Sequence, residues 1–248
     1  MQIVAHRGAS VDAPENTLPA IELAWQQGAD AVEIDVRASR DGKVVVIHDP
    51  TTARTAGRAE AVASQSLAEL RQLDAGTWKN SQFAGTHIPT LGEALECVPS
   101  GKNLLIELKC GTPLLADLQS TLSAHDPAGA RAILIAFSLP LLRRVRQALP
   151  QIPAYWVWDV RRTATSDRIK LSQRLLHLVR RSGVQGLNLS ACPLIDKPFA
   201  RRLQSTGCHV GTWTVDDAET ARNMLAAGAD SLTTNRPGWI REQIQQSK

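Results

Sequence analysis

The feature that most constrains the fold of this chain is a repeat in which a short apolar run is followed by a stretch with helical periodicity. Eight such units follow one another along the 248 residues, and their apolar runs lie at 3–5, 31–37, 104–108, 132–137, 154–157, 186–189, 209–215 and 231–234. Eight alternating units with short connections favour a closed barrel over an open doubly wound sheet. We therefore predict a (β/α)₈ TIM-type barrel in which residues 1–248 form a single domain.

Residues 50–88 interrupt this repeat. They follow the second predicted strand and a short apolar run at 44–47 that pairs with it or extends it. The interruption is polar as far as residue 66, and then Leu67, Leu70 and Leu73 predict one short helix. Because these residues include few apolar side chains, we expect a small insertion after the second strand and not a separate domain.

Composition narrows the classes of partner. The chain carries 28 basic and 24 acidic residues, a net charge of +4, without a long basic run, which disfavours nucleic acid. Its four cysteines have neither paired nor zinc-like spacing, which is typical of free thiols in a reducing compartment. We expect no secretory signal, and no apolar run approaches the ~20 residues of a membrane-spanning helix. We expect a cytoplasmic protein without stable membrane association.

The predicted strand Ala31–Arg37 gives the first indication of a site. Its apolar residues share one parity and its charged residues share the other, so that one face carries Glu33, Asp35 and Arg37. Two carboxylates inside a barrel are costly unless a metal ion or other cations compensate them. Glu33 and Asp35 are therefore candidate metal ligands, whereas for Arg37 we expect a structural ion pair.

Further polar residues fall at the carboxyl ends of the predicted strands, where barrel enzymes carry their active sites. They are His6, Arg7, His48, Glu107, Lys109 and Trp213. Each residue alone has a structural interpretation, because a lone histidine is more often a core residue than a catalyst. Unrelated residues would not all fall at strand ends, so we interpret the set as one site.

The residue types in this set indicate one kind of chemistry. Three carboxylates (Glu33, Asp35, Glu107) are hard oxygen ligands that suit Mg²⁺ or Ca²⁺, and zinc is disfavoured because softer ligands are missing. Two histidines form a candidate general acid–base pair, and two cations can hold phosphate oxygens; these residues are His6, His48, Arg7 and Lys109. Together they predict metal-assisted cleavage of a phosphate ester.

Several short motifs occur in a fixed order along the chain: Ala5-His6-Arg7-Gly8-Ala9, Pro14-Glu15-Asn16-Thr17, Glu33-Ile34-Asp35-Val36, His48-Asp49, Ile88-Pro89-Thr90-Leu91, Glu107-Leu108-Lys109, Trp213-Thr214-Val215-Asp216 and Thr234-Asn235-Arg236-Pro237. In this order they resemble the glycerophosphodiester phosphodiesterase family. The resemblance covers nearly the whole chain, and the ordered set is far more specific than any single motif.

This resemblance implies a barrel with an insertion after the second strand and hydrolysis of a small-molecule glycerophosphodiester to glycerol 3-phosphate and an alcohol. It assigns the metal to Glu33, Asp35 and Glu107, the acid–base roles to His6 and His48, and the phosphate contacts to Arg7 and Lys109. In the implied route the glycerol 2-hydroxyl attacks phosphorus, one histidine accepts its proton, the other protonates the leaving alcohol, and water opens the cyclic phosphate. The sequence does not assign the two roles to individual histidines.

Aromatic residues are candidates for the wall of the substrate pocket. The family often has Ser-Phe after the fourth strand, whereas this chain reads Ala136-Phe137-Ser138, which leaves Phe137 as an apolar wall. The aromatic run at 155–158 has a structural interpretation as core packing. The alternative hypothesis is that Trp158 or Trp213 contacts the glycerol or alcohol moiety.

Two other functions compete with hydrolysis. A phosphodiester lyase on the same barrel, similar to bacterial phospholipases, would stop at the cyclic phosphate. A non-catalytic phosphate-binding module is the rival of a different class, and the complete set of histidines and acids argues against it.

Overall fold

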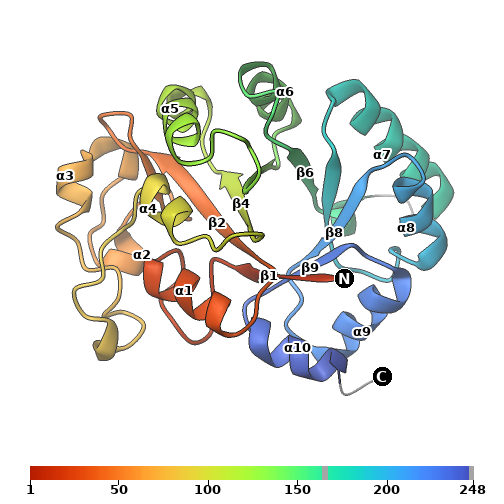
Figure 1. The fold of residues 1–248 in the computed structure, drawn as a ribbon, viewed down its shortest axis with the longest axis horizontal. Coiled ribbons are helices and arrows are strands. Elements are labelled where there is room, and N and C mark those ends of the chain that lie inside the picture. The colour runs from red at the N-terminus through yellow and green to blue at the C-terminus, as the bar shows by residue number, and fades with distance from the viewer. Residues whose placement is uncertain (164–166, 246–248) are drawn as a thin grey trace.

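The computed structural model describes residues 1–163 and 167–245, and it confirms the predicted barrel (Figure 1). Eight parallel strands are ordered β1-β9-β8-β7-β6-β5-β4-β2, and β1 also pairs with β2, which closes the sheet. The strands are β1 Gln2–His6, β2 Ala31–Ala38, β4 Asn103–Leu108, β5 Ala132–Ala136, β6 Ala154–Trp158, β7 Gly186–Ser190, β8 His209–Trp213 and β9 Ser231–Thr234. A further strand, β3 Val44–Val46, pairs antiparallel with the end of β2.

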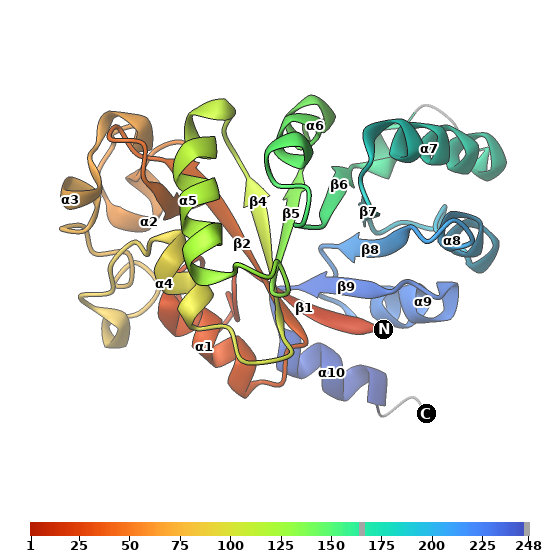
Figure 2. The same ribbon diagram turned by 45° about the horizontal axis from the view of Figure 1, so that its top comes forward.

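Helices surround the barrel, as the two views in Figures 1 and 2 show. They are α1 Leu18–Gln26, α4 Leu91–Glu96, α5 Leu115–His125, α6 Leu139–Ala148, α7 Arg168–Ser182, α8 Lys197–Gln204, α9 Ala218–Ala227 and α10 Pro237–Gln245. Their starts follow local capping chemistry: Thr90 and Glu93 form a capping box on α4, and Asp196 and Asp217 cap α8 and α9. Within the described residues, no helix combines the length and apolar character needed to cross a lipid bilayer.

The two faces of each strand have different environments. On β2 the residues Val32, Ile34 and Val36 pack into the large core between strands and helices. The barrel interior contains a smaller apolar cluster of Val4, Ala31, Leu105, Ile135 and Val157. Charged residues of β2 and β4 therefore point inward above this cluster, as the period of two requires.

The insertion lies on one flank of the barrel, coloured orange to yellow in Figure 1. The short helix predicted from Leu67, Leu70 and Leu73 is present as α3 Leu67–Leu70, and the insertion also contains α2 Ala53–Ala56 and two 3₁₀ turns, Val62–Ser64 and Ser81–Phe83. The three elements that were not predicted are each about one turn of helix, which is too short to give a periodic signal in the sequence. A small apolar cluster packs the insertion against β3, the strand that pairs with the end of β2: Val45, Ile47, Val62, Leu70, Ala75 and Ile88.

Two strands are shorter than predicted. The strand predicted at 132–137 ends at Ala136, where the carbonyl of Phe137 accepts a hydrogen bond from Trp156 Nε1 (3.0 Å) instead of a backbone partner. The strand predicted at 209–215 ends at Trp213, because its pairing with β7 stops at Ser190. Phe137 and the residues after Trp213 thus belong to the rim of the barrel.

A tight turn joins β1 to the loop that precedes α1. Arg7 and Gly8 both have positive φ, 58° and 83°. A Cβ atom on Gly8 would lie 2.5 Å from the carbonyl carbon of Ala20 on α1, a distance that a backbone neighbour cannot accommodate. Glycine at position 8 therefore allows α1 to pack directly beneath the turn that presents Arg7.

We expect Gly8→Ala to destabilise the protein more than Gly183→Ala. Gly183 also has positive φ (72°), but a Cβ there has no neighbour within 4 Å. Both changes carry the penalty for a side chain in the left-handed region, about 1–2 kcal/mol, and only Gly8→Ala adds overpacking, about 1–3 kcal/mol. Urea unfolding monitored by tryptophan fluorescence measures the difference. Equal midpoints for the two variants would contradict this account of the turn.

Candidate active site

Three buried carboxylates meet at the carboxyl ends of β2 and β4. The register pairs Asp35 with Glu107 across these strands, and Glu33 lies on the same face of β2. One oxygen from each residue lies within 4.8 Å of the others. All three side chains are buried, so their mutual repulsion is poorly screened by water.

Two cations compensate part of this negative charge. Lys109 Nζ lies 2.7 Å from Glu107 Oε1 and 3.1 Å from Asp35 Oδ1, and Arg7 Nε lies 3.1 Å from Asp35 Oδ2. Burial acts to raise the pKa of Asp35, but Lys109 and Arg7 outweigh it and lower that pKa. Burial and the two neighbouring carboxylates raise the pKa of Glu33 well above its usual value. Glu33 is thus the member of the cluster whose charge is least compensated.

The cluster fits a divalent metal ion. Among the described residues, the buried Oε1 atom of Glu33 has no hydrogen-bond partner. A buried carboxylate oxygen without a partner is costly unless a proton or a cation satisfies it. The donor set consists of carboxylate oxygens, which bind hard cations such as Mg²⁺ and Ca²⁺. Glu33, Asp35 and Glu107 can therefore hold such an ion.

His6 is held in one tautomer by Asn235. Asn235 Nδ2 donates to Asp216 Oδ2 (2.5 Å), so Asn235 Oδ1 must be the atom that faces His6 Nδ1 at 2.8 Å. Because a carboxamide oxygen only accepts, His6 Nδ1 carries the proton and Nε2 faces the pocket, 3.9 Å from Glu33 Oε2. Burial lowers the pKa of His6, which favours a neutral ring with a free lone pair on Nε2.

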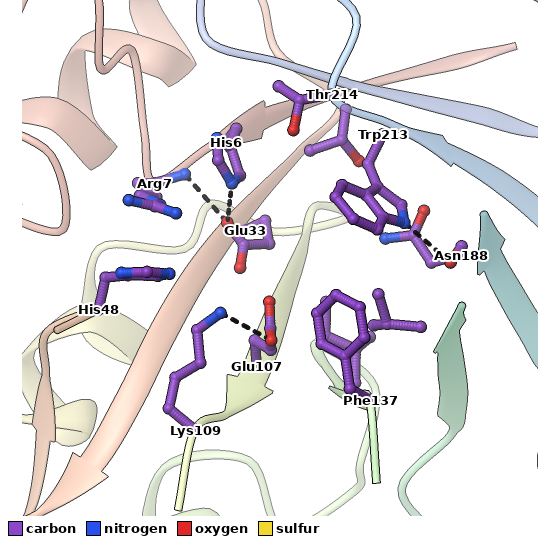
Figure 3. Close-up of a pocket in the computed structure, with 13 residues that line it drawn as sticks. His6, Arg7, Glu33, His48, Glu107, Lys109, Phe137, Asn188, Trp213 and Thr214 are labelled. Carbon is purple, nitrogen blue, oxygen red and sulfur yellow. Dashed lines mark hydrogen bonds and ion pairs between the residues drawn. The ribbon is translucent and has the colours of Figure 1, made fainter. Parts of the chain in front are cut away.

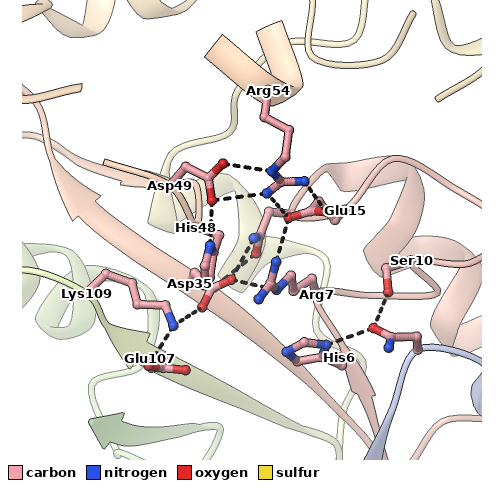
Figure 4. A network of polar contacts seen from close by, with 12 residues as sticks. His6, Arg7, Ser10, Glu15, Asp35, His48, Asp49, Arg54, Glu107 and Lys109 are labelled. Atoms are coloured by element: carbon pink, nitrogen blue, oxygen red, sulfur yellow. Dashed lines mark hydrogen bonds and ion pairs between the residues drawn. The ribbon is translucent and has the colours of Figure 1, made fainter. Parts of the chain in front are cut away.

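His48 is oriented through a network that reaches the insertion (Figure 4). Its Nδ1 lies 2.7 Å from Asp49 Oδ1, and Arg54 on α2 donates from Nε to Asp49 Oδ2 at 2.7 Å. The same guanidinium donates two hydrogen bonds of 2.8 Å to Glu15, which also accepts one from Arg7 Nη1 at 2.8 Å. Hydrogen bonds from Arg54 and His48 hold the pKa of Asp49 far below its usual value. Arg54 therefore connects the partner of His48 to the partner of Arg7.

These groups border a pocket of about 210 Å³ at the barrel mouth (Figure 3). Of the nine residues predicted for the site, eight line it: His6, Arg7, Glu33, His48, Glu107, Lys109, Phe137 and Trp213. Asp35 is the exception, because it is completely buried behind Arg7 and Lys109. The aromatic rings of Phe137 and Trp213 meet edge to face with centroids 5.5 Å apart and form an apolar corner.

Only one of the two tryptophans proposed for the pocket wall lines this pocket. Trp213 does, with Nε1 donating to the carbonyl of Asn188 (3.0 Å). Trp158 instead packs edge to face on Trp156, with centroids 4.5 Å apart, beside the main core. The structural interpretation of the aromatic run therefore holds for Trp158.

The prediction of an ion pair for Arg37 is wrong. Arg37 Nε donates to the carbonyl oxygen of His48 at 2.8 Å, and Nη1 donates to that of Lys109 at 3.4 Å. Both acceptors are backbone atoms at the ends of strands, which no side-chain pattern reports. Arg37 therefore ties together the two segments that present His48 and Lys109.

Sequence reasoning did not assign roles to Asn16, Glu15, Arg54 or Asn235. Asn16 has φ 58°, and its amide donates to Asp35 Oδ2 (2.8 Å) and accepts from the Asp35 backbone N–H (3.0 Å). Asn16, Glu15 and Asn235 lie in motifs that carried the family resemblance, which was an available signal. Arg54 lies in the insertion, and nothing in its local sequence distinguishes it from a solvated arginine.

The site combines carboxylates, cations and histidines at the mouth of a parallel barrel, and this combination is typical of enzymes that cleave phosphate esters. Comparison with known proteins identifies the family within this class of enzyme. Residues 6–239 match the profile described as "Glycerophosphoryl diester phosphodiesterase family". The glycerophosphodiester phosphodiesterase of Caldanaerobacter subterraneus subsp. tengcongensis is 30% identical over 95% of this chain and 94% of its own length, and that of Bacillus subtilis is 30% identical over 94% and 83%. The chain belongs to the glycerophosphoryl diester phosphodiesterase family.

Solved structures of other proteins have the same fold as this chain. A phosphodiesterase from Oleispira antarctica, in complex with the product sn-glycerol-3-phosphate, superposes with a TM-score of 0.86 at 32% identity and covers 99% of this chain and 97% of its own. A glycerophosphodiester phosphodiesterase from Agrobacterium tumefaciens gives a TM-score of 0.82 at 25% identity, with 98% and 99% covered. The barrel is thus the family's fold over the full length.

We expect Arg54→Ala to lower phosphodiesterase turnover about 10- to 100-fold, the effect typical of residues that orient groups in direct contact with a site. The change removes the hydrogen bonds that fix Asp49 and Glu15, and with them the positions of His48 and Arg7. Steady-state kcat measures the loss. Arg58→Ala, which removes a surface ion pair with Glu60 in the same insertion, is the matched control and should change kcat less than twofold. Full turnover by Arg54→Ala would exclude the orienting role.

Proposed function

We propose that this protein hydrolyses glycerophosphodiesters to glycerol 3-phosphate and an alcohol, with Mg²⁺ or Ca²⁺ held by Glu33, Asp35 and Glu107. The observation that carries the proposal is the placement of His6 and His48 on one pocket around a buried carboxylate whose oxygen lacks a partner. Family membership supports the reaction class, and the product in the Oleispira structure supports the substrate class.

Each charged group has a place in this reaction. A divalent ion bound to the three carboxylates would supply Lewis-acid stabilisation of charge on the phosphoryl oxygens. Arg7 and Lys109 line the same pocket and provide N–H donors to those oxygens. Phe137 and Trp213 exclude water from the opposite wall, which strengthens these electrostatic interactions.

In the first step His6 is the base. The glycerol 2-hydroxyl oxygen attacks phosphorus while its proton passes to the free Nε2 of His6. The bond between phosphorus and the alcohol oxygen breaks, and that oxygen takes the electron pair and a proton from His48 Nε2. Asp49 holds the Nδ1 proton of His48, so Nε2 is the position that exchanges the proton. The products of this step are a cyclic glycerol phosphate and the free alcohol.

The second step reverses the roles. Water attacks phosphorus and gives its proton to His48, which is now neutral. The ring bond to the glycerol 2-oxygen breaks, and His6 returns its proton to that oxygen. Glycerol 3-phosphate leaves, and both histidines regain their starting protonation states.

The central experiment is turnover of glycerophosphocholine or glycerophosphoethanolamine followed by phosphorus NMR. We expect glycerol 3-phosphate as the end product with Mg²⁺ or Ca²⁺ present, and loss of turnover in EDTA that either ion reverses. EDTA removes the compensating charge from three carboxylates that repel one another. A cyclic phosphate that accumulates as the end product would favour the lyase, and a lack of turnover with both ions would favour a binding module.

We expect His48→Ala to reduce kcat about 10²- to 10⁴-fold, the usual contribution of a general acid or base. The side chain lies at the pocket and is partly exposed, so its removal should change the unfolding midpoint little. His177→Ala is the control, because His177 is an exposed residue on α7. Retention of most activity by His48→Ala would remove this residue from the mechanism.

A further inference from the structure

The pocket has two unlike halves, and the charged groups proposed for the reaction all lie in one of them. His6, Glu33 and Glu107 on β1, β2 and β4 belong to the charged half (Figure 3). The other half comes from β5 to β9 and is uncharged: Ile135, Phe137, Val157, Asn188, Trp213, Thr214 and Thr233. The chemistry described above assigns the aromatic pair to this half and leaves its polar side chains without a role.

Two of those polar side chains are buried and have unsatisfied atoms. Asn188 on β7 is 5% exposed and Thr233 on β9 is 2% exposed. Within the described part of the chain, neither Asn188 Oδ1 nor Thr233 Oγ1 has a hydrogen-bond partner, although both residues line the pocket. Buried polar atoms in native proteins usually have partners, so two exceptions in the lining of one pocket, on strands β7 and β9 that flank β8, indicate a ligand that satisfies them.

The surrounding structure makes room for this arrangement. The register places Asn188 beside Gly211 on β8, and a Cβ atom on Gly211 would lie 3.0 Å from Asn188 Oδ1. Trp213, two residues along β8, covers the same wall and donates its indole N–H to the Asn188 carbonyl. Glycine at position 211 thus leaves space for the amide, and the indole encloses it.

We propose that Asn188 and Thr233 bind the hydroxyl groups of the glycerol moiety and thereby determine which end of the phosphodiester enters the pocket. The proposal rests on the proposed function and adds the residues that recognise glycerol. An amide and a hydroxyl each donate and accept hydrogen bonds, which matches a polyol, and neither attracts a charged alcohol such as choline. The apolar residues Ile135 and Val157 beside them suit the carbon chain.

The position of His6 agrees with this orientation. Figure 3 shows His6 on the side of the pocket that carries Thr214 and Trp213, and His48 on the side that carries Lys109. Glycerol held by Asn188 and Thr233 therefore has its 2-hydroxyl on the side of the base.

The leaving alcohol then faces the acid, and the structure offers it space on that side. A second, more open groove continues past Lys109 and Phe137, bordered by Leu108, Cys110 and Leu141. This groove has no counterpart to the unsatisfied Asn188 and Thr233 atoms among the described residues. The enclosed half thus recognises the constant part of the substrate, and the open groove accommodates the variable alcohol.

The test compares two ligands that differ only in hydroxyl groups, sn-glycerol 3-phosphate and n-propyl phosphate, by isothermal titration calorimetry of the Mg²⁺-loaded protein. The wild type should bind glycerol 3-phosphate more tightly. Thr233→Val and Asn188→Leu should each lower the affinity for glycerol 3-phosphate about three- to tenfold, the effect of one lost uncharged hydrogen bond. Both should change the affinity for n-propyl phosphate less than twofold.

Two control variants separate recognition from folding. Thr233→Ser keeps the hydroxyl and should retain the wild-type preference. Thr212→Val removes a buried hydroxyl from β8 that donates to the Ser231 carbonyl (3.3 Å) and does not line the pocket, so it should not change the preference either.

The results distinguish this proposal from the proposed function. Three outcomes would overturn the role of Asn188 and Thr233. The variants could lose affinity for both ligands equally, they could keep the wild-type affinity for glycerol 3-phosphate, or the wild type could bind the two ligands equally well. Binding is measured without turnover, so a wild type that prefers glycerol 3-phosphate but cleaves no diester would contradict the reaction and support the recognition site.

Discussion

Charge compensation around three buried carboxylates is the interaction on which the rest of this site depends. Glu33, Asp35 and Glu107 point into one barrel end, where burial makes their charges costly. Lys109 and Arg7 compensate Asp35 and Glu107, and Glu33 is left with an oxygen that lacks a protein partner. The three carboxylates carry more negative charge than Lys109 and Arg7 compensate. Such a site suits a divalent ion, and a bound divalent ion in turn suits a phosphate group.

The two histidines are held by different means, which supports the different roles proposed for them. An amide oxygen accepts a hydrogen bond from His6 Nδ1–H inside the barrel, where burial lowers the pKa of the ring and favours its neutral form. A carboxylate accepts a hydrogen bond from His48 Nδ1–H near the surface, and Arg54 holds that carboxylate in place from the insertion. The insertion therefore supports the active site directly, although it contributes little to the barrel core.

Recognition and catalysis use opposite walls of the same pocket. Strands β1, β2 and β4 carry the charged residues, and strands β5 to β9 carry neutral ones. Such a division allows the phosphoryl group to be held by charge while the glycerol moiety is recognised by uncharged hydrogen-bonding groups.

Local pattern in the sequence predicted the barrel and eight of the nine candidate site residues, because strand periodicity decides which side chains face inward and the strand ends decide where they meet. Phe137 was added by the family resemblance. Tertiary structure alone decided the partners. Asn235 meets His6 across 229 positions and Arg54 meets Glu15 across 39, through contacts that local periodicity does not encode. Arg37 shows the same limit. The alternation along β2 predicts which face carries its side chain, but its backbone acceptors depend on how two segments 72 residues apart are packed.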